Sequence, residues 1–133
     1  FIYNSDFAVG SRLPAAYTAS GRAMLAKLPM AERLRLIEST PLVKITAQTV
    51  TDPEELLRSI EAAERDGYAI VQNQTVVGDI SVAAAITGRG GVPIGAITIS
   101  APSTRWGTAK AEAELLPHVL LAATSISNIL DNF

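Results

Sequence analysis

The segment GDISVAAAITGRGGVPIGAITISAP, residues 78–102, decides the fold of this chain. Bulky apolar residues alternate with small or hydroxyl-bearing ones from Asp79 to Thr87 and again from Ile94 to Ala101, as in half-buried strands. Gly88 to Gly91 contains three glycines, which is typical of a hairpin loop. The segment therefore predicts two antiparallel strands that share one bulky face and one small face.

The small face of this hairpin is the first candidate site. A hairpin register places Ser81 on the same face as Thr98 and Ser100, among alanines. Serine, threonine and alanine leave space that leucine or isoleucine would fill. Two interpretations stay open: a helix backbone packs closely on this face, or a small pocket with convergent hydrogen-bond donors lies over it.

Helical patterns precede the hairpin. Thr18 to Pro29 predicts a helix that Thr18 or Ser20 caps and Pro29 stops. A second helix is predicted from Ala31 to about Ile37, with Leu34, Leu36 and Ile37 as its apolar residues. Ile45 to Val50 is rich in β-branched residues and weakly predicts a strand.

A third helix and a strand are predicted next. Thr51 and Glu54 form a capping-box pattern, which predicts a helix that starts here and ends at Gly67 in a left-handed cap. A strand is predicted from Tyr68 to Gln72. Phe1 to Tyr3 also resembles the end of a strand.

The C-terminal region predicts a long helix that Thr108 caps, with apolar residues at spacings of three and four up to Phe133. Pro117 lies inside this pattern, and we expect a kink or a break there. Parallel crossovers are few, so the order of elements favours an α+β fold: an antiparallel sheet with helices packed on it.

Composition narrows the class of protein. With 133 residues, 48% hydrophobic and 18% charged, the chain predicts one folded domain over 1–133 and excludes intrinsic disorder. Its net charge is −2 and its basic residues do not cluster, which argues against a large phosphate-binding surface. Cysteine is absent, which excludes disulfides and thiolate chemistry. We expect neither a metal nor a cofactor.

The ends and the hydropathy of the chain bear on its cellular location and on membrane contact. No apolar run reaches the length of a membrane span, and the N-terminus has no features of a signal peptide. The chain lacks an initiator Met and starts within an apparent strand. We therefore expect a fragment of a longer cytoplasmic protein that does not contact a membrane.

The helix opening at Thr18 is the second candidate site. The first N–H groups of a helix have no partner within it, and with the macrodipole they favour a carboxylate, which Ala19 and Gly21 would let approach. A plain helix cap is the alternative. An enzyme with Ser81 or Ser100 as nucleophile lacks a base, because His118 is the only histidine and lies far away in sequence. A pure oligomerisation module is a third possibility.

Several stretches together resemble the C-terminal effector-binding domain of the IclR family of bacterial transcription regulators, in the family's order and spacing over nearly the whole chain. These stretches are Val9–Pro14, Thr18–Ala26, Thr51–Leu56, Asp66–Ala69, Gly78–Ala84, Gly91–Pro102 and Ser103–Trp106.

The resemblance implies a GAF-like antiparallel sheet that binds a small organic effector, with no catalytic role. Backbone donors to the effector's carboxylate fall on Ala19 and Ser20, an apolar wall falls on Leu13, and polar groups fall on the hairpin strands. The effector site implied in this way comprises Leu13, Thr18, Ala19, Ser20, Val71, Gln74, Ser81, Thr98 and Ser100.

The resemblance also implies partners: dimers or tetramers through this domain, and DNA only through an N-terminal winged helix–turn–helix that this chain lacks. Relatives commonly carry acidic residues soon after the Gly–Tyr pair, where this chain has the neutral stretch Val71 to Gln74. That difference indicates an effector with no amine or metal to neutralise.

Overall fold

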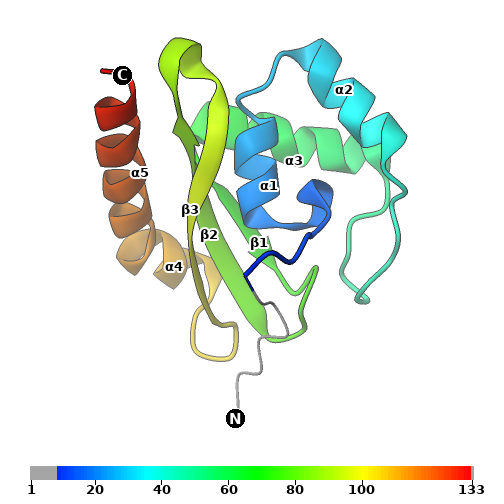
Figure 1. Ribbon diagram of the computed structural model, residues 1–133. Coiled ribbons are helices and arrows are strands. Elements are labelled where there is room, and N and C mark those ends of the chain that lie inside the picture. Colours follow the sequence, from blue (N-terminus) through cyan, green and yellow to red (C-terminus); the bar gives the residue numbers. More distant parts are fainter. Residues whose placement is uncertain (1–8, 133) are drawn as a thin grey trace.

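The computed structural model describes residues 9–132 and shows an α+β fold (Figure 1). Within that range the elements are η1 (Ala15–Tyr17), α1 (Ala19–Leu25), α2 (Met30–Ser39), α3 (Pro53–Asp66), β1 (Ala69–Gln72), β2 (Asp79–Thr87), η2 (Arg89–Gly91), β3 (Pro93–Pro102), α4 (Thr108–Glu114) and α5 (Leu116–Leu130). The strand expected at Phe1 to Tyr3 lies outside the described residues.

The hairpin is confirmed. β2 has the predicted bounds, β3 extends one residue beyond them at each end, and a 3₁₀ turn with two left-handed glycines joins the strands. The strand order is β1-β2-β3, antiparallel throughout. Ser81 pairs with Ser100 and Ala83 with Thr98, so these residues share one face as the alternation predicted.

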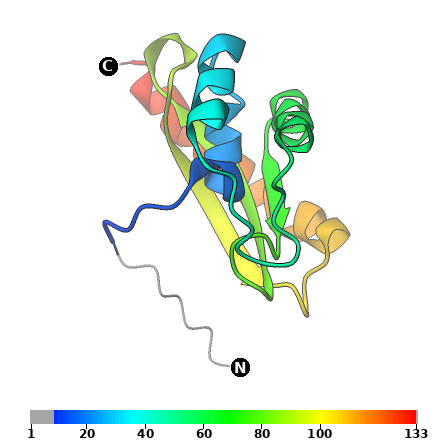
Figure 2. The same ribbon diagram turned by 90° about the vertical axis from the view of Figure 1, so that its right-hand side faces the viewer.

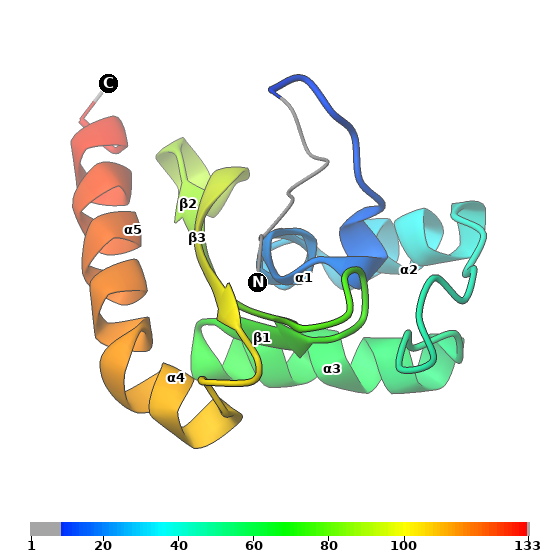
Figure 3. The same ribbon diagram turned by 90° about the horizontal axis from the view of Figure 1, so that it is seen from below.

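Helices cover both faces of this sheet. In Figure 3, α4 and α5 lie on one side of the sheet and α1 lies on the other, with α3 beside β1. The bulky face packs on α4 and α5 through Ile80, Val82 and Val119, all fully buried. Figure 2 shows α2 lying outside α1, so the small face is covered by α1 with α2 behind it.

The two interpretations of the small face each hold at a different place. Ala83 is fully buried among residues of α1 such as Ala19 and Ala23, which is close packing of helix on sheet. Toward the start of β2, Ser81 and Ser100 line a cavity instead. Small side chains thus bring α1 close at one point and leave space at the next.

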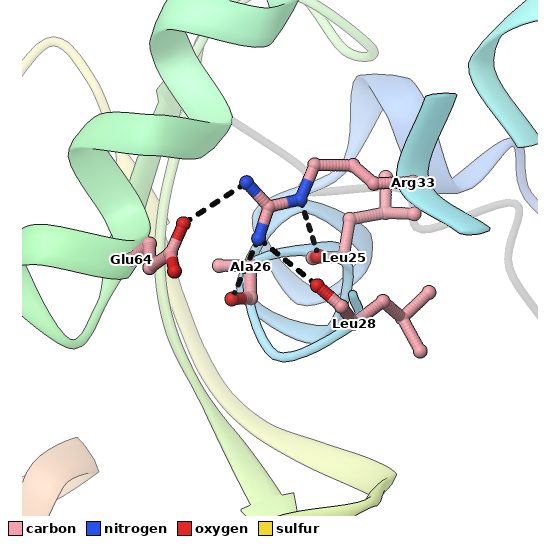
Figure 4. Close-up of polar contacts among 5 residues, drawn as sticks. All are labelled: Leu25, Ala26, Leu28, Arg33 and Glu64. Carbon is pink, nitrogen blue, oxygen red and sulfur yellow. Dashed lines mark hydrogen bonds and ion pairs between the residues drawn. The ribbon is translucent and has the colours of Figure 1, made fainter. Parts of the chain in front are cut away.

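Two features fix the position of α1. A Cβ on Gly21 would lie 2.0 Å from the carbonyl oxygen of Ala15, so only glycine permits this contact between η1 and α1. At the other end, the buried guanidinium of Arg33 donates to the carbonyl oxygens of Leu25, Ala26 and Leu28 at 3.0–3.1 Å and pairs with Glu64 at 3.0 Å (Figure 4). Arg33 therefore supplies donors to carbonyl oxygens at and just after the C-terminal end of α1, where intrahelical partners run out.

Arg33 also corrects the predicted face of α2. Leu34, Leu36 and Ile37 are the apolar residues of the predicted helix, but the residues that α2 buries are Arg33 and Ile37, and Leu36 is exposed. The reason is that α2 lies against the C-terminal end of α1, where carbonyl oxygens accept hydrogen bonds from an arginine and could not from a leucine.

The strand predicted from Ile45 to Val50 is wrong, because this segment forms a turn. The hydroxyl of Thr49 accepts the N–H of Thr46 at 2.8 Å, and the hydroxyl of Thr46 accepts the N–H of Gln48 at 3.1 Å. Threonine side chains that bind nearby backbone in this way compete with strand formation despite their β propensity.

Helix ends differ from the prediction by one or a few residues. α3 is capped by Asp52, whose carboxylate accepts the N–H of Glu54 at 3.2 Å, and not by Thr51. Gly107, not Thr108, precedes α4. α1 ends at Leu25, before Pro29 is reached. The left-handed cap at Gly67 is confirmed, with φ 83°.

The break expected near Pro117 is also found: α4 and α5 meet there at a bend of 48°. Among helices of the described chain, none alone is long and apolar enough to cross a membrane. Only α4 and α5 taken together reach that length and composition, across this bend.

Candidate ligand-binding site

A cavity of about 150 Å³ lies between the start of α1 and the sheet. Four separate parts of the chain line it: the residues before α1, the start of α1, β1 with the β1–β2 connection, and β2 with β3. Its lining contains Leu13, Tyr17, Thr18, Ala19, Ser20, Val71, Asn73, Gln74, Thr75, Val76, Asp79, Ser81, Thr98 and Ser100. All nine residues of the effector site implied by the resemblance are in this lining.

A hydroxyl pair joins α1 to β3. The oxygens of Ser20 and Thr98 lie 2.6 Å apart, so one hydroxyl donates to the other. Thr18 is the cap of α1: its side-chain oxygen accepts the N–H of Gly21 at 2.9 Å. Of the two capping residues that the sequence allowed, Thr18 takes the role, which leaves Ser20 to face the sheet.

A second hydroxyl pair lies wholly on the sheet. The hydroxyl of Ser81 donates to the carboxylate of Asp79 at 2.7 Å, and the oxygens of Ser81 and Ser100 are 2.8 Å apart. A serine has one hydroxyl proton. Because the proton of Ser81 goes to Asp79, Ser100 must be the donor in the bond between the two serines.

A buried cation stands behind the cavity. The guanidinium of Arg22 donates to three neutral oxygens: the carbonyl of Ala16 at 2.8 Å, the hydroxyl of Ser59 at 3.4 Å and the side-chain carbonyl of Gln74 at 2.5 Å. Burial lowers the pKa of Arg22 to about 10, while Glu55 acts in the opposite direction, so the group is charged at neutral pH.

Arg22 sets the orientation of Gln74. A guanidinium has only donors, so the amide carbonyl of Gln74 must face it, and the N–H of Val50 approaches the same oxygen at 3.4 Å. The amide nitrogen therefore faces away from Arg22, and it has no hydrogen-bond partner within residues 9–132. Because Gln74 lines the cavity, this amide nitrogen is a candidate donor to a ligand there.

The connection that carries Gln74 is pinned in place. Asn73 adopts a left-handed conformation with φ 57°, and its side-chain oxygen accepts the N–H of Gly78 at 2.7 Å. The hydroxyl of Thr49 donates to the backbone carbonyl of Gln74 at 2.6 Å, and Thr46 donates to that of Asn73. The unexpected turn at Thr46 to Thr49 therefore supports one wall of the cavity.

The contacts explain two features of the site. The close approach of Ala15 requires a glycine at position 21. Ser81 and Ser100 are not donors toward the cavity, because both of their protons are engaged on the sheet. The helix opening is also modest, since α1 has only seven residues and a correspondingly small dipole.

The sequence reasoning missed Asp79, Arg22 and Tyr17. Asp79 lines the cavity, which therefore contains one carboxylate although the stretch after Tyr68 is neutral. The signal for Asp79 was a charged residue at the first position of a strand whose alternate residues, Ser81 included, are small or polar. A charged residue between Gly21 and Ala23, in a helix of small residues, was the signal for Arg22.

The enzyme alternative finds no support in this arrangement. His118 is exposed on α5, which covers the opposite face of the sheet from the cavity. In the part of the chain that the structure describes, no three carboxylate or histidine side chains gather in a way that could hold a metal ion.

Comparison with known proteins places the chain in a family. A family model described as "Bacterial transcriptional regulator IclR C-terminal" matches residues 3–128, nearly the whole chain. The chain therefore belongs to this family of C-terminal domains, as the resemblance implied, and its family and relatives are transcriptional regulators and not enzymes.

The relatives agree with this assignment. The HTH-type transcriptional repressor AllR of Escherichia coli K12 is 37% identical over 97 residues, which cover 73% of this chain and 36% of AllR. The chain thus spans about a third of the length of the curated relatives that it matches.

Solved structures show the same fold. A transcriptional regulator from Rhodococcus sp. RHA1 has a TM-score of 0.91 and 32% identity, covering 99% of this chain and 53% of its own. The inducer-binding domain of PobR from Acinetobacter, a double mutant in complex with 3-hydroxybenzoic acid, has a TM-score of 0.86 and 24% identity. That match covers 97% of this chain and 75% of the PobR chain.

Proposed function

We propose that this chain is the sensing domain of a bacterial transcription regulator, and that the cavity beside α1 binds a small organic acid. The observation that carries the proposal is the cavity itself. Four distant segments bring a small apolar wall, two hydroxyl pairs and an amide donor together around a space of about 150 Å³. A concave site with a few convergent polar groups is the usual form of a small-molecule site.

The charge of the effector follows from Arg22 and Gln74. A buried guanidinium bonded to neutral oxygens produces a positive potential that solvent screens weakly. Gln74 lies between Arg22 and the cavity lining. Because its carbonyl oxygen binds Arg22, its amide nitrogen is the end left to donate to an anion in the cavity. The pair Ser20 and Thr98 adds one hydroxyl proton. Together these groups favour an anion, and a carboxylate is the small planar anion that accepts several such donors.

The fold is compatible with such a ligand, since the PobR domain of the same fold was solved with a small aromatic acid. In the whole regulator, we infer that effector binding changes DNA affinity through an N-terminal helix–turn–helix outside this chain, in the cytoplasm. By linkage, this change cannot exceed the difference in effector affinity between the two states of the regulator.

The test is a thermal-shift screen of the chain against small oxo, hydroxy and aromatic acids, each paired with its amide. An acid at one hundred times its dissociation constant should stabilise the fold by about 2.7 kcal/mol, and its amide should stabilise it much less. If acids and their amides give equal shifts, the cavity does not recognise an anion and the proposal fails.

We also propose that the domain forms dimers or tetramers. Leu121 and Ile129 on α5, and Ile94 on β3, are large apolar side chains more than half exposed. Apolar side chains left in water in this way mark interaction surfaces when they lie together. Light scattering should show a mass above 14.0 kDa, and a strict monomer at high protein concentration would contradict the proposal.

A further inference from the structure

The polar groups of the cavity are not equivalent, because the two hydroxyl pairs present opposite chemistry. Ser20 and Thr98 have two protons between them and use one in their own bond, so one remains. Ser81 and Ser100 also have two, but one goes to Asp79 and the other lies between the serines. At the end of the cavity near Asp79, neither serine therefore has a proton left for a ligand, and Ser100 and Asp79 present acceptor oxygens.

Asp79 can accept a hydrogen bond from a ligand even though its carboxylate already has partners. A carboxylate accepts about four hydrogen bonds, so Asp79 can bind Ser81 and still accept from another group. The oxygen of Ser100, which donates its proton to Ser81, keeps lone pairs toward solvent. An anion placed here would meet a like charge and no donor from either serine.

The two ends are close enough for one small molecule to reach both. Ser81 pairs with Ser100 and Ala83 pairs with Thr98, two residues further along β2. At about 3.4 Å per residue in an antiparallel strand, the two hydroxyl pairs lie about 7 Å apart along the strand. Both pairs line the same cavity.

We propose that the effector is bifunctional: its carboxylate binds at the end formed by Ser20, Thr98 and Gln74, and a hydroxyl or amine on the same molecule donates to Asp79 and Ser100. This inference rests on the proposed function and narrows the class of effector from small acids to small hydroxy or amino acids. It replaces the expectation of an effector without an amine, which assumed a site without an acid.

The experiment compares matched acids that differ in one group. One series is butanoate, 3-hydroxybutanoate, 3-methoxybutanoate and 3-aminobutanoate; the other is benzoate, 3-hydroxybenzoate and 3-methoxybenzoate. Calorimetric titration of the chain measures each dissociation constant. In at least one series, the hydroxy or amino acid should bind about tenfold tighter than its parent acid, because it adds a charge-assisted hydrogen bond to Asp79. The methoxy acid, which cannot donate, should bind no better than the parent.

Two variants assign the preference to Asp79. Asp79→Asn removes the negative charge and keeps the size of the side chain, so the hydroxy or amino acid should bind less tightly and the parent acid more tightly. Ser81→Ala keeps the carboxylate of Asp79 but removes the acceptor of the Ser100 proton. The Ser100 hydroxyl is then free to donate into the cavity, so the preference for hydroxy or amino acids over the parent acid should become smaller. Circular dichroism checks that each variant is folded.

The outcomes separate the two proposals. Equal binding of parent, hydroxy, amino and methoxy acids, unchanged in Asp79→Asn and Ser81→Ala, would overturn this inference and leave acid binding intact. A preference for the donor-bearing acids that survives in both variants would also overturn it, because the donor would then bind elsewhere. If no acid of either series binds, the proposed function fails in this site and the inference fails with it.

Discussion

The cavity contains two hydroxyl pairs of nearly the same composition, and they differ in what holds them together. Ser20 and Thr98 come from different layers, so their bond exists only while α1 stays against β3. Ser81 and Ser100 are neighbours in one sheet, paired in register and anchored on Asp79. One pair depends on packing between layers, and the other depends on backbone hydrogen bonds of the hairpin.

This difference teaches that residue type alone does not determine what a site recognises. All four side chains are hydroxyls that can donate or accept. A single carboxylate next to one pair orders its protons and turns that end into an acceptor. The other pair has no such neighbour in the described network and keeps a proton to offer. The chemistry of each pair is decided by its neighbours.

The largest effect should come from releasing the end of α1. Arg33→Met removes a buried group that donates to three carbonyls, and should lower the free energy of unfolding by about 3–5 kcal/mol, because buried acceptors lose their partners. Urea unfolding measures this loss. The control is Arg35→Gln on the same helix, which breaks only an exposed pair with Glu32 and should cost about 0.5 kcal/mol or less. Similar losses in both variants would show that Arg33 does not anchor α1.

A second variant separates the two pairs directly. Gly21→Ala places a methyl group against the backbone of Ala15, so α1 must move, and stability should fall by about 2–3 kcal/mol. The bond from Ser20 to Thr98 should break while the sheet pair persists. Gly95→Ala is the control, because its Cβ would meet only a methyl group of Ile86 at 3.9 Å. An unfolding energy in Gly21→Ala equal to that of Gly95→Ala would contradict this account of α1.

The sequence predicted the sheet pair well because local rules govern it. Alternation fixes which face each strand residue occupies, and the glycine loop fixes the register, so Ser81, Thr98 and Ser100 fell on one face without reference to the rest of the chain. The contact of Ser20 with Thr98 joins residues 78 positions apart. No periodicity reports such a contact: the helix opening at Thr18 to Gly21 indicated a candidate site that included Ser20, but not that Ser20 meets Thr98.

The errors of the sequence analysis likewise lie where contacts between distant residues, and not local patterns, decide the structure. The turn at Thr46 to Thr49 was read as a strand because β propensity ignores hydrogen bonds from side chains to backbone. Arg22 and Arg33 were missed because charged residues are normally exposed, and what buries these two is the set of carbonyls and amides that surrounds them in the folded chain. Asp79 was taken only as the start of a strand.

The third effect concerns binding at the pair between layers. Thr98→Val keeps the shape of the side chain and removes its hydroxyl. The site for the ligand's carboxylate then loses either the hydroxyl that donates to it or the oxygen that orients the Ser20 hydroxyl. The dissociation constant of an acid found in the screen should rise about tenfold. Thr98→Ser restores the hydroxyl and should bind within about threefold of the native chain. A Thr98→Val variant that binds as tightly as Thr98→Ser would remove this pair from the site.

The smallest effect is expected at the sheet pair, and it makes the comparison sharpest. Ser100→Ala deletes a hydroxyl from the same strand and the same cavity as Thr98→Val, but its proton points to Ser81 and not to the ligand. Binding of an acid without a second donor group, such as butanoate or benzoate, should therefore change by less than about threefold, since no donor to the carboxylate is lost. Calorimetric titration of both variants with one acid gives the comparison directly. If Ser100→Ala weakens that acid as much as Thr98→Val does, Ser100 is donating to the ligand, and the opposite polarity of the two pairs does not exist.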